Sequence, residues 1–196
     1  APARRGAVGA RWRATIRVEP LRIRYTDAHK GADFVSPWQL PVAVLLSAQT
    51  TDGSVNSVTP ALFTRYPRPE DLATAEQGDV EVIIHKTGFF RSKALAIREM
   101  SQDVVRLHGG EVPPRMEDLV KLRGVGRKTA NVVLGVAFGV PGFPVDTHVT
   151  RLTHKLRLTS STDPVKREAD VCGIVPAADL ADPSLRLILH RVPACT

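Results

Sequence analysis

Four basic side chains surround a short glycine-containing turn in the second half of the sequence. They flank the tripeptide Gly124-Val125-Gly126 and are Lys121, Arg123, Arg127 and Lys128. Two glycines one residue apart let the backbone turn tightly and approach another molecule without an intervening Cβ. If a helix begins after Gly126, its first N–H groups point outward with the positive end of the helix dipole. The pattern predicts an anion site, with a DNA phosphate as the favoured anion; an ordinary corner between two helices is the alternative.

The distribution of charge also favours an anionic partner. The formal net charge is +7, and the basicity lies in residues 1–24 and residues 119–162, each with a net charge of +6. The first block is rich in arginine and contains the single acid Glu19, which is typical of a solvated or phosphate-seeking arm, with a transit peptide as the alternative. The second block surrounds the turn, so the local charge favours nucleic acid.

The composition excludes several classes of protein. No apolar run approaches the roughly 18 residues that a membrane-spanning helix needs, so no membrane partner is expected. The 43% hydrophobic content is too high for wholesale disorder. Two cysteines, Cys172 and Cys195, are too few for a disulfide scaffold and indicate a reducing compartment. We expect an intracellular protein, in the cytoplasm or on the nucleoid.

Helical periodicity runs through most of the chain, and no stretch shows the sustained alternation typical of strands. Residues 38–46 are apolar on nearly all sides, which predicts a buried helix with Pro41 in its first turn. In residues 92–107, apolar side chains recur every three or four positions until Gly109 and Gly110. Other helices are expected over residues 51–63, 70–75, 80–88, 116–122, 127–138, 147–158, 164–175 and 184–190. We therefore predict an all-α fold of roughly ten helices with short loops.

Six short motifs occur in the order and approximate spacing of one known family. They are L-L-S-A-Q-T-T-D at 45–52, T-G-F-F-R-S-K-A at 87–94, G-E-V-P at 110–113, L-R-G-V-G-R-K-T-A-N-V-V at 122–133, V-D-T-H at 145–148 and L-I-L-H at 187–190. The series resembles the endonuclease III family of helix-hairpin-helix DNA glycosylases and abasic-site lyases. The resemblance implies an all-α, two-domain fold with a cleft between the domains for DNA and a flipped base.

The same resemblance implies domain boundaries and DNA contacts. A six-helix barrel-like domain with the helix-hairpin-helix is expected over residues 38–140. Residues 1–37 would form a basic arm and the start of a second helical domain, which continues through residues 141–196. At the hairpin, the residues expected to contact DNA are Gly124, Val125, Gly126, Arg127 and Thr129.

The resemblance assigns the nucleophile to Lys128. A lysine attacks only as the free amine, and the start of a helix beside Arg127 and Lys121 disfavours its protonated form. Attack on C1′ of a damaged nucleotide would expel the base, form a Schiff base with the opened sugar and permit β-elimination. We therefore predict a bifunctional DNA glycosylase and abasic-site lyase of base excision repair that acts on oxidised pyrimidines. A lysine that only contacts phosphate, in a catalytically impaired DNA-binding paralogue, is the alternative.

Other positions acquire roles by the same resemblance. Asp146 matches an essential carboxylate that could stabilise positive charge on the sugar or relay protons, and an N-cap of the following helix explains it as well. Gln49 matches a residue that fills the gap left by a flipped base, and Phe89 a wedge into the opposite strand. The alternatives are a helix-end amide bonded to backbone for Gln49 and a core ring for Phe89, and the core is preferred for Phe90. Asp52 matches an aspartate near the pocket, although a helix cap explains it equally well.

The cysteines depart from the family pattern. The family commonly ends with C-x6-C-x2-C-x5-C, which holds a [4Fe–4S] cluster, whereas only Cys195 matches the first ligand and Thr196 follows it. One thiolate cannot hold a four-iron cluster, and Cys172 is typical of a small buried residue. The cluster loop of the second domain is therefore expected to be missing. We expect no metal or cofactor on residues 1–196, the alternative being a [4Fe–4S] cluster if a cysteine loop exists beyond Thr196.

Two further departures lie at Arg123 and Arg91, where the family usually has proline and asparagine. The expected partner is double-stranded DNA that contains damaged pyrimidines or abasic sites, and the chain is expected to act as a monomer.

Overall fold

The computed structural model describes residues 36–175, apart from the side chain of His148. The basic arm over residues 1–24, the helix expected over 184–190 and Cys195 lie outside the described residues. The chain divides into two compact units, with the break between Phe138 and Gly139. Within the described residues every regular element is helical, so the all-α prediction is confirmed.

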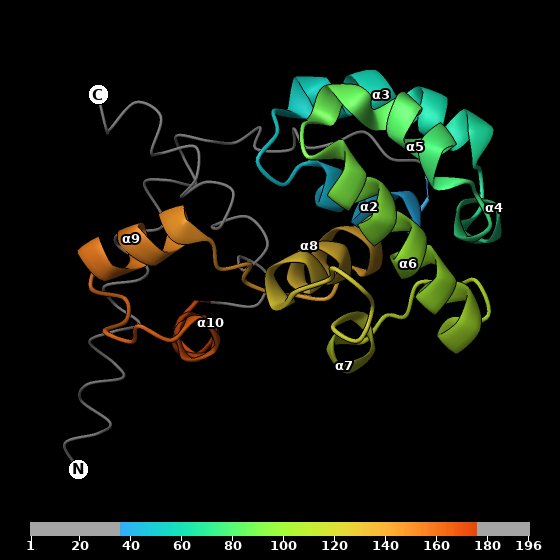
Figure 1. The fold of residues 1–196 in the computed structure, drawn as a ribbon. Coiled ribbons are helices and arrows are strands. Elements are labelled where there is room, and N and C mark those ends of the chain that lie inside the picture. The colour runs from blue at the N-terminus through green and yellow to red at the C-terminus, as the bar shows by residue number, and fades with distance from the viewer. Residues whose placement is uncertain (1–35, 176–196) are drawn as a thin grey trace, which may run out of the picture. The chain divides into compact units, whose positions relative to one another are not determined.

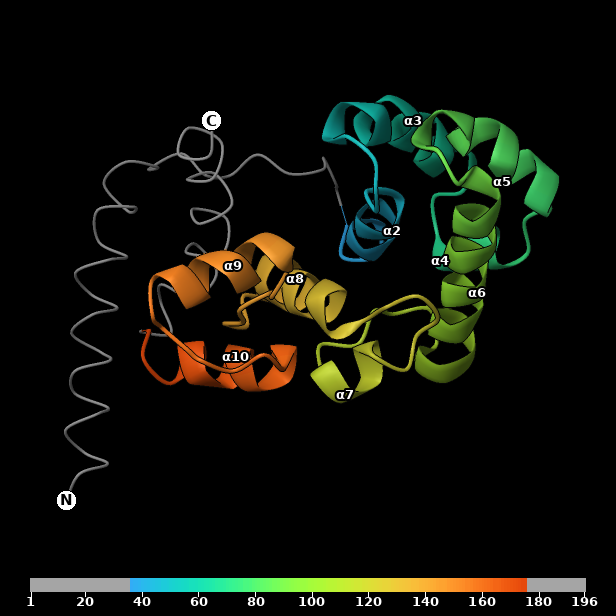
Figure 2. The ribbon, with the colours of Figure 1, turned by 60° about the vertical axis from the view of Figure 1, so that its left-hand side comes forward.

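The larger unit contains eight of these elements in its described part (Figure 1). They are α2 (Gln39–Leu46), α3 (Asp52–Arg65), α4 (Pro69–Ala73), α5 (Gln77–Ile84), the 3-10 helix η1 (His85–Thr87), α6 (Phe90–His108), α7 (Met116–Leu119) and α8 (Arg127–Phe138). The predicted helices are present, with ends shifted by a few residues. In both Figure 1 and Figure 2, α6 extends from the neighbourhood of α5 towards α7.

The central helix α6 buries one face in the core of the larger unit. Ala94, Ile97, Met100 and Val104 are fully buried on it, and α2, α4 and α5 pack against the helix. This face is the three-and-four periodicity predicted for residues 92–107. The helix ends where Gly109 adopts a left-handed conformation with φ +61°.

Helix α2 is the buried helix that its composition predicts. Leu40, Pro41, Val42, Ala43 and Leu46 are buried, and the helix packs against α3, α6 and α8. Proline in the first turn loses no helical hydrogen bond because its N–H would have no partner there. Helix α2 therefore lies in the interior of the larger unit, between the helices that pack against it.

The smaller unit contains α9 (Thr147–Lys155) and α10 (Pro164–Cys172) in its described part. Its core consists of Phe143, Val149, Leu152, Leu158, Val171 and Val175. Helix α9 was expected to reach residue 158 but ends earlier, because Arg157 adopts a left-handed φ of +52°. The Leu158 N–H then returns to the Thr153 carbonyl at 2.9 Å, which closes the helix. Figures 1 and 2 both show α9 and α10 side by side.

A buried arginine joins helices α9 and α10 of the smaller unit. The Arg167 guanidinium donates to the Thr150 carbonyl at 3.0 Å, to Thr153 Oγ1 at 2.9 Å and to the Ser161 carbonyl. A charged donor in a buried position stabilises the fold when its acceptors are in place, and its removal leaves those acceptors without a partner.

We predict that Arg167→Met lowers the free energy of unfolding of the smaller unit by about 2–4 kcal/mol. The methionine keeps apolar volume but cannot donate to the three oxygens. Chemical denaturation followed by circular dichroism measures the change, and Lys166→Met, at an exposed neighbour on the same helix, is the matched control. Equal stability of the two variants would contradict the role given to the guanidinium.

Candidate active site

The hairpin segment, residues 116–138, consists of α7, a turn and α8. Leu119, Leu122 and Val125 are buried and anchor the turn in the core of the larger unit. Gly124 has a φ of +77°, and a Cβ there would lie 3.2 Å from Cδ2 of Leu45. The turn therefore requires glycine at position 124 for its backbone conformation and for its packing.

Gly126 is open to the outside, because a Cβ placed on it would meet no heavy atom within 4 Å. Its carbonyl accepts the Ala130 N–H at 2.9 Å, which is the first hydrogen bond of α8. The N–H groups of Arg127, Lys128 and Thr129 precede that bond, so no carbonyl within the helix pairs with them. The start of α8 thus has the arrangement expected of an anion site, with bare backbone next to outward N–H donors.

The remaining residues of the turn differ in what they present. The Val125 side chain is buried and its N–H donates to the Leu122 carbonyl at 3.1 Å, so Val125 packs the turn from within. The Lys128 side chain is exposed, and it forms no ion pair with a carboxylate in residues 36–175. The Thr129 side chain is half-buried beside it.

Two of the four basic side chains pair with acids that lie before the turn in the sequence. Lys121 Nζ is 2.9 Å from Asp118 Oδ1, and Arg123 Nε is 3.1 Å from Glu99 Oε2. The hydrogen bond from Lys121 holds the pKa of Asp118 below its ordinary value. Counting only the basic residues therefore overstates the positive charge of the hairpin segment, because Asp118 of α7 and Glu99 of α6 pair with two of them.

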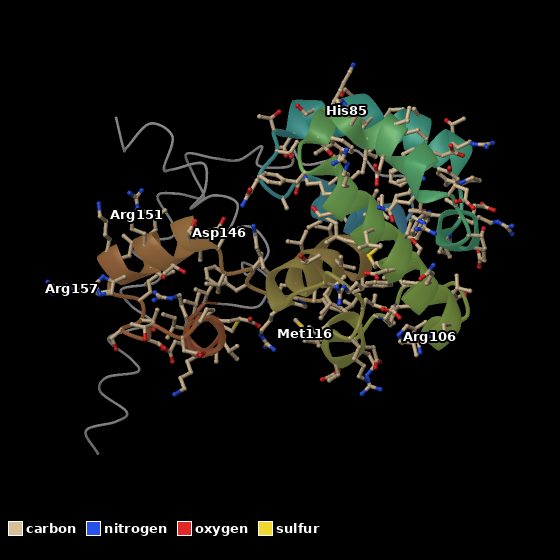
Figure 3. All side chains as sticks on the ribbon, viewed as in Figure 1. His85, Arg106, Met116, Asp146, Arg151 and Arg157 are labelled. Carbon is tan, nitrogen blue, oxygen red and sulfur yellow. The ribbon has the colours of Figure 1, made fainter. Side chains whose placement is uncertain are left out.

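The turn is also tied to α6 through its backbone. The Arg123 N–H donates to Asp103 Oδ2 at 3.1 Å, and Asp103 Oδ1 accepts from Arg106 at 2.6 Å. Figure 3 labels Arg106 near the end of α6. Proline, the usual residue of the resembled family at position 123, has no N–H and could not make this bond. In this chain the departure from the family pattern is therefore matched by a carboxylate that holds the turn.

We predict that Asp103→Ala lowers the free energy of unfolding by about 1–2 kcal/mol, because the Arg123 N–H and Arg106 lose their acceptor. The freed turn should also bind duplex DNA several-fold more weakly. Fluorescence anisotropy with a labelled duplex and chemical denaturation measure the two effects. Glu111→Ala removes the same charge from an exposed site and is the control. Indistinguishable results for the two variants would show that Asp103 does not hold the turn.

Gln49 and Phe89 both adopt a left-handed backbone conformation, with φ values of 54° and 46°. In the described part of the chain only Arg157 shares this feature among residues other than glycine. The Gln49 side chain is exposed and makes no hydrogen bond to the described residues, unlike a helix-end amide bonded to backbone. The Phe89 side chain is 69% exposed, so it is not a core ring. Left-handed bulky residues are uncommon and gather at functional sites.

Phe90, in contrast, lies against the core as predicted. Its ring is partly buried, and its centroid is 4.5 Å from that of the His85 ring. Figure 3 labels His85, which lies just after α5. The two adjacent phenylalanines thus separate into one that supports the loop and one that projects from it.

A buried charged side chain that the sequence did not single out is Lys93. It lies on the inner face of α6, four residues before Ile97 and seven before Met100, and is only 6% exposed. This position on a buried face was the signal available in the sequence, since lysine is almost never fully buried without partners.

Asp146 caps α9 in the smaller unit, as its alternative interpretation predicts. Its Oδ1 accepts the Val149 N–H at 2.7 Å, and its carbonyl accepts the Thr150 N–H at 2.8 Å. The half-buried carboxylate is therefore held at the beginning of the helix, where Figure 3 labels it. For Asp52 the cap interpretation is wrong, because the N-cap of α3 is Thr51, whose hydroxyl accepts the Ser54 N–H at 3.3 Å. Asp52 is the first residue of that helix.

In residues 36–138 every regular element is helical, and the open start of a helix follows a glycine turn that the buried Val125 anchors. This arrangement is typical of a helix-hairpin-helix protein. Comparison with known proteins gives the same result. Residues 42–176 match the model of the HhH-GPD superfamily of base excision DNA repair proteins. The chain therefore belongs to this superfamily.

Within the superfamily the chain is similar to endonuclease III. It is 47% identical to Endonuclease III of Synechocystis sp. (strain ATCC 27184 / PCC 6803 / Kazusa) over 184 residues, which cover 93% of this chain and 84% of that protein. A non-covalent Endonuclease III–DNA complex matches with a TM-score of 0.87 and 35% identity over 95% of this chain and 87% of the other. A trapped covalent Endonuclease III–DNA intermediate matches with a TM-score of 0.86 and 36% identity over 94% and 88%. Among the helices of residues 36–175, none is long and apolar enough to cross a membrane.

Proposed function

We propose that the chain excises oxidised pyrimidines from duplex DNA through attack by Lys128 and then cleaves the strand. The enzyme is a DNA glycosylase with abasic-site lyase activity in base excision repair. The observation that carries the assignment to Lys128 is its exposed position in the first turn of α8, directly after the open Gly126. A phosphate bound at the N–H groups of that turn would place the neighbouring sugar within reach of the side chain.

In the proposed reaction an amine, and not water, displaces the damaged base. The free amine of Lys128 forms a bond to C1′, while the bond from C1′ to the base breaks and the base leaves with its electron pair and gains a proton. Opening of the sugar ring converts the adduct into a protonated imine. The imine acidifies the 2′ hydrogen, whose loss expels the 3′ phosphate by β-elimination. Water then hydrolyses the imine and restores Lys128.

Asp146 is proposed to act on the sugar as a carboxylate. Its cap bond to the Val149 N–H at 2.7 Å fixes the group at the start of α9. A fixed negative charge can stabilise positive charge that develops on the sugar as the base departs, or it can relay a proton. The capping and catalytic roles use the same carboxylate and are compatible.

Gln49 and Phe89 are proposed to open the duplex. Flipping a base out of the stack costs roughly a few kcal/mol, and side chains that occupy the vacated space offset part of this cost. Both residues project from loops of the larger unit with exposed side chains, one an amide and one an apolar ring. Their chemistry fits a gap-filling residue and a wedge between bases, respectively.

Residues 1–196 do not by themselves supply the ligands of the four-iron cluster of the resembled family. Such a cluster needs four ligands, and residues 1–196 contain two cysteines. Cys172 lies on α10 and packs against the core of the smaller unit. In residues 36–175 no group of three or more His, Cys, Asp or Glu side chains could hold a metal ion. No step of the reaction is therefore assigned to a cluster.

The residues proposed above come from one chain, and we propose that it acts as a monomer on intracellular DNA.

Borohydride trapping tests the nucleophile. We predict that the wild-type chain forms a covalent adduct with a duplex that contains an abasic site or thymine glycol, because borohydride reduces the imine. Lys128→Gln should lower the rate of adduct formation on the order of a thousandfold or more. Lys166→Gln, an exposed lysine on α10, should leave it unchanged.

The results separate the candidate functions. Binding of the duplex by the wild-type chain without any adduct would identify a DNA-binding paralogue and refute the lyase assignment. An adduct that persists in Lys128→Gln would show that another amine is the nucleophile. Thymine glycol left intact beside active cleavage of abasic sites would refute the proposed class of damaged base.

A further inference from the structure

The ammonium of Lys93 is buried inside the larger unit and surrounded by oxygen atoms. Its Nζ donates to the Leu46 carbonyl at 2.7 Å, to Thr50 Oγ1 at 2.6 Å and to the Thr87 carbonyl at 2.7 Å. A lysine has three N–H donors, so each of them has an acceptor here. Burial lowers the pKa of Lys93 below its ordinary value, and the three acceptors favour the protonated form against that effect.

The three acceptors lie in or directly next to two separate loops. Leu46 is the last residue of α2 and Thr50 precedes α3, so both flank the exposed Gln49. Thr87 ends η1, two residues before the exposed Phe89. The Thr50 hydroxyl also donates to the Thr87 carbonyl, which joins the loops a second time. The Lys93 backbone N–H completes the arrangement by donating to the Phe89 carbonyl at 3.1 Å.

Both loops hold their projecting residue in a conformation that side chains with a Cβ rarely adopt. Gln49 and Phe89 have φ values of 54° and 46°, and such positions persist only when surrounding contacts determine them. The contacts that do so at each loop converge on Lys93. A lysine that only filled space in the core would not need to bind two loops that each carry a residue with a left-handed backbone.

We propose that Lys93 is a positioning residue that fixes the Gln49 loop and the Phe89 loop relative to each other, so that the two side chains enter the duplex as a pair. The inference rests on the proposed duplex-opening roles of these two side chains. Without the ammonium, the two carbonyls and the hydroxyl lose their common donor and the loops can move apart. Opening the duplex then requires ordering them again at the moment of binding, which slows the flipping of a paired base.

The test compares two activities of the full chain under single-turnover conditions. Excision of thymine glycol paired with adenine requires the base to be flipped, whereas strand cleavage at a preformed abasic site has no base to extract. We expect Lys93→Met to slow excision about tenfold while cleavage at the abasic site stays within about threefold of wild type. Lys93→Arg retains donors and should recover most of the excision rate. Fluorescence of 2-aminopurine beside the lesion should report slower flipping of the base in Lys93→Met and not in Lys93→Arg.

A milder pair of variants carries the same test if Lys93→Met does not fold. Thr50→Val removes the hydroxyl that links the ammonium to the Thr87 carbonyl, and Thr50→Ser keeps it. Thr50→Val should slow excision several-fold with little change at the abasic site, and Thr50→Ser should match wild type. Because Lys93 acts through the loops, Lys93→Met combined with Gln49→Ala should lose less than the product of the two single losses.

The outcomes are decisive for the inference. A selective loss of excision in Lys93→Met or Thr50→Val, with recovery in Lys93→Arg or Thr50→Ser, supports it. An equal loss of both activities, an unchanged flipping rate or fully multiplicative losses in the combined variant would overturn it. If the wild-type chain neither excises nor cleaves, the proposed function itself fails. If the wild type is active and the variants keep its ratio of activities, only the role of Lys93 is refuted.

Discussion

The burial of one face of α6 is the constraint on which the larger unit depends. Ala94, Ile97, Met100 and Val104 are fully buried, and α2, α4 and α5 pack around them. Polar groups on the same helix hold the segments of the site. Lys93, in its first turn, binds both loops that carry projecting side chains, and near its other end Asp103 accepts from the turn that precedes α8. One helix thereby contacts three loops that are far apart in the sequence.

The positive charge around the hairpin depends on which basic side chains pair with acids as well as on how many basic residues the segment contains. The hairpin segment is rich in bases, yet Lys121 and Arg123 are engaged by Asp118 and Glu99. These pairs are exposed, so each adds little stability, but they reduce the positive field around the turn. The backbone donors at the start of α8 are unaffected by such pairing. In an anion site built from backbone N–H groups, the helix fixes the direction in which the donors point, and the neighbouring charged side chains set how strongly the site attracts an anion.

Much of the fold was predictable because local patterns and the global structure agree. The apolar stripe of residues 92–107, the all-round apolar α2 and the glycine turn at Gly124 each have one low-energy solution, and the structure contains it. Helix ends were less predictable. Arg157 ends α9 in a left-handed conformation that residue type alone does not favour, and Thr51 rather than Asp52 caps α3 although both are good capping residues.

The candidate site residues Lys128, Asp146, Gln49 and Phe89 were named from the sequence through its resemblance to the endonuclease III family. Whether such side chains are exposed, buried or paired could be read only from the contacts in the structure. Phe89 is exposed beside a half-buried Phe90, Arg123 pairs with α6, and Lys93 is buried among three oxygens. Each of these states depends on segments that are distant along the chain. Periodicity and propensity describe a residue and its near neighbours. Whether a charge is paired or a ring is covered depends on which distant segment packs against it, and the packing of the core decides that.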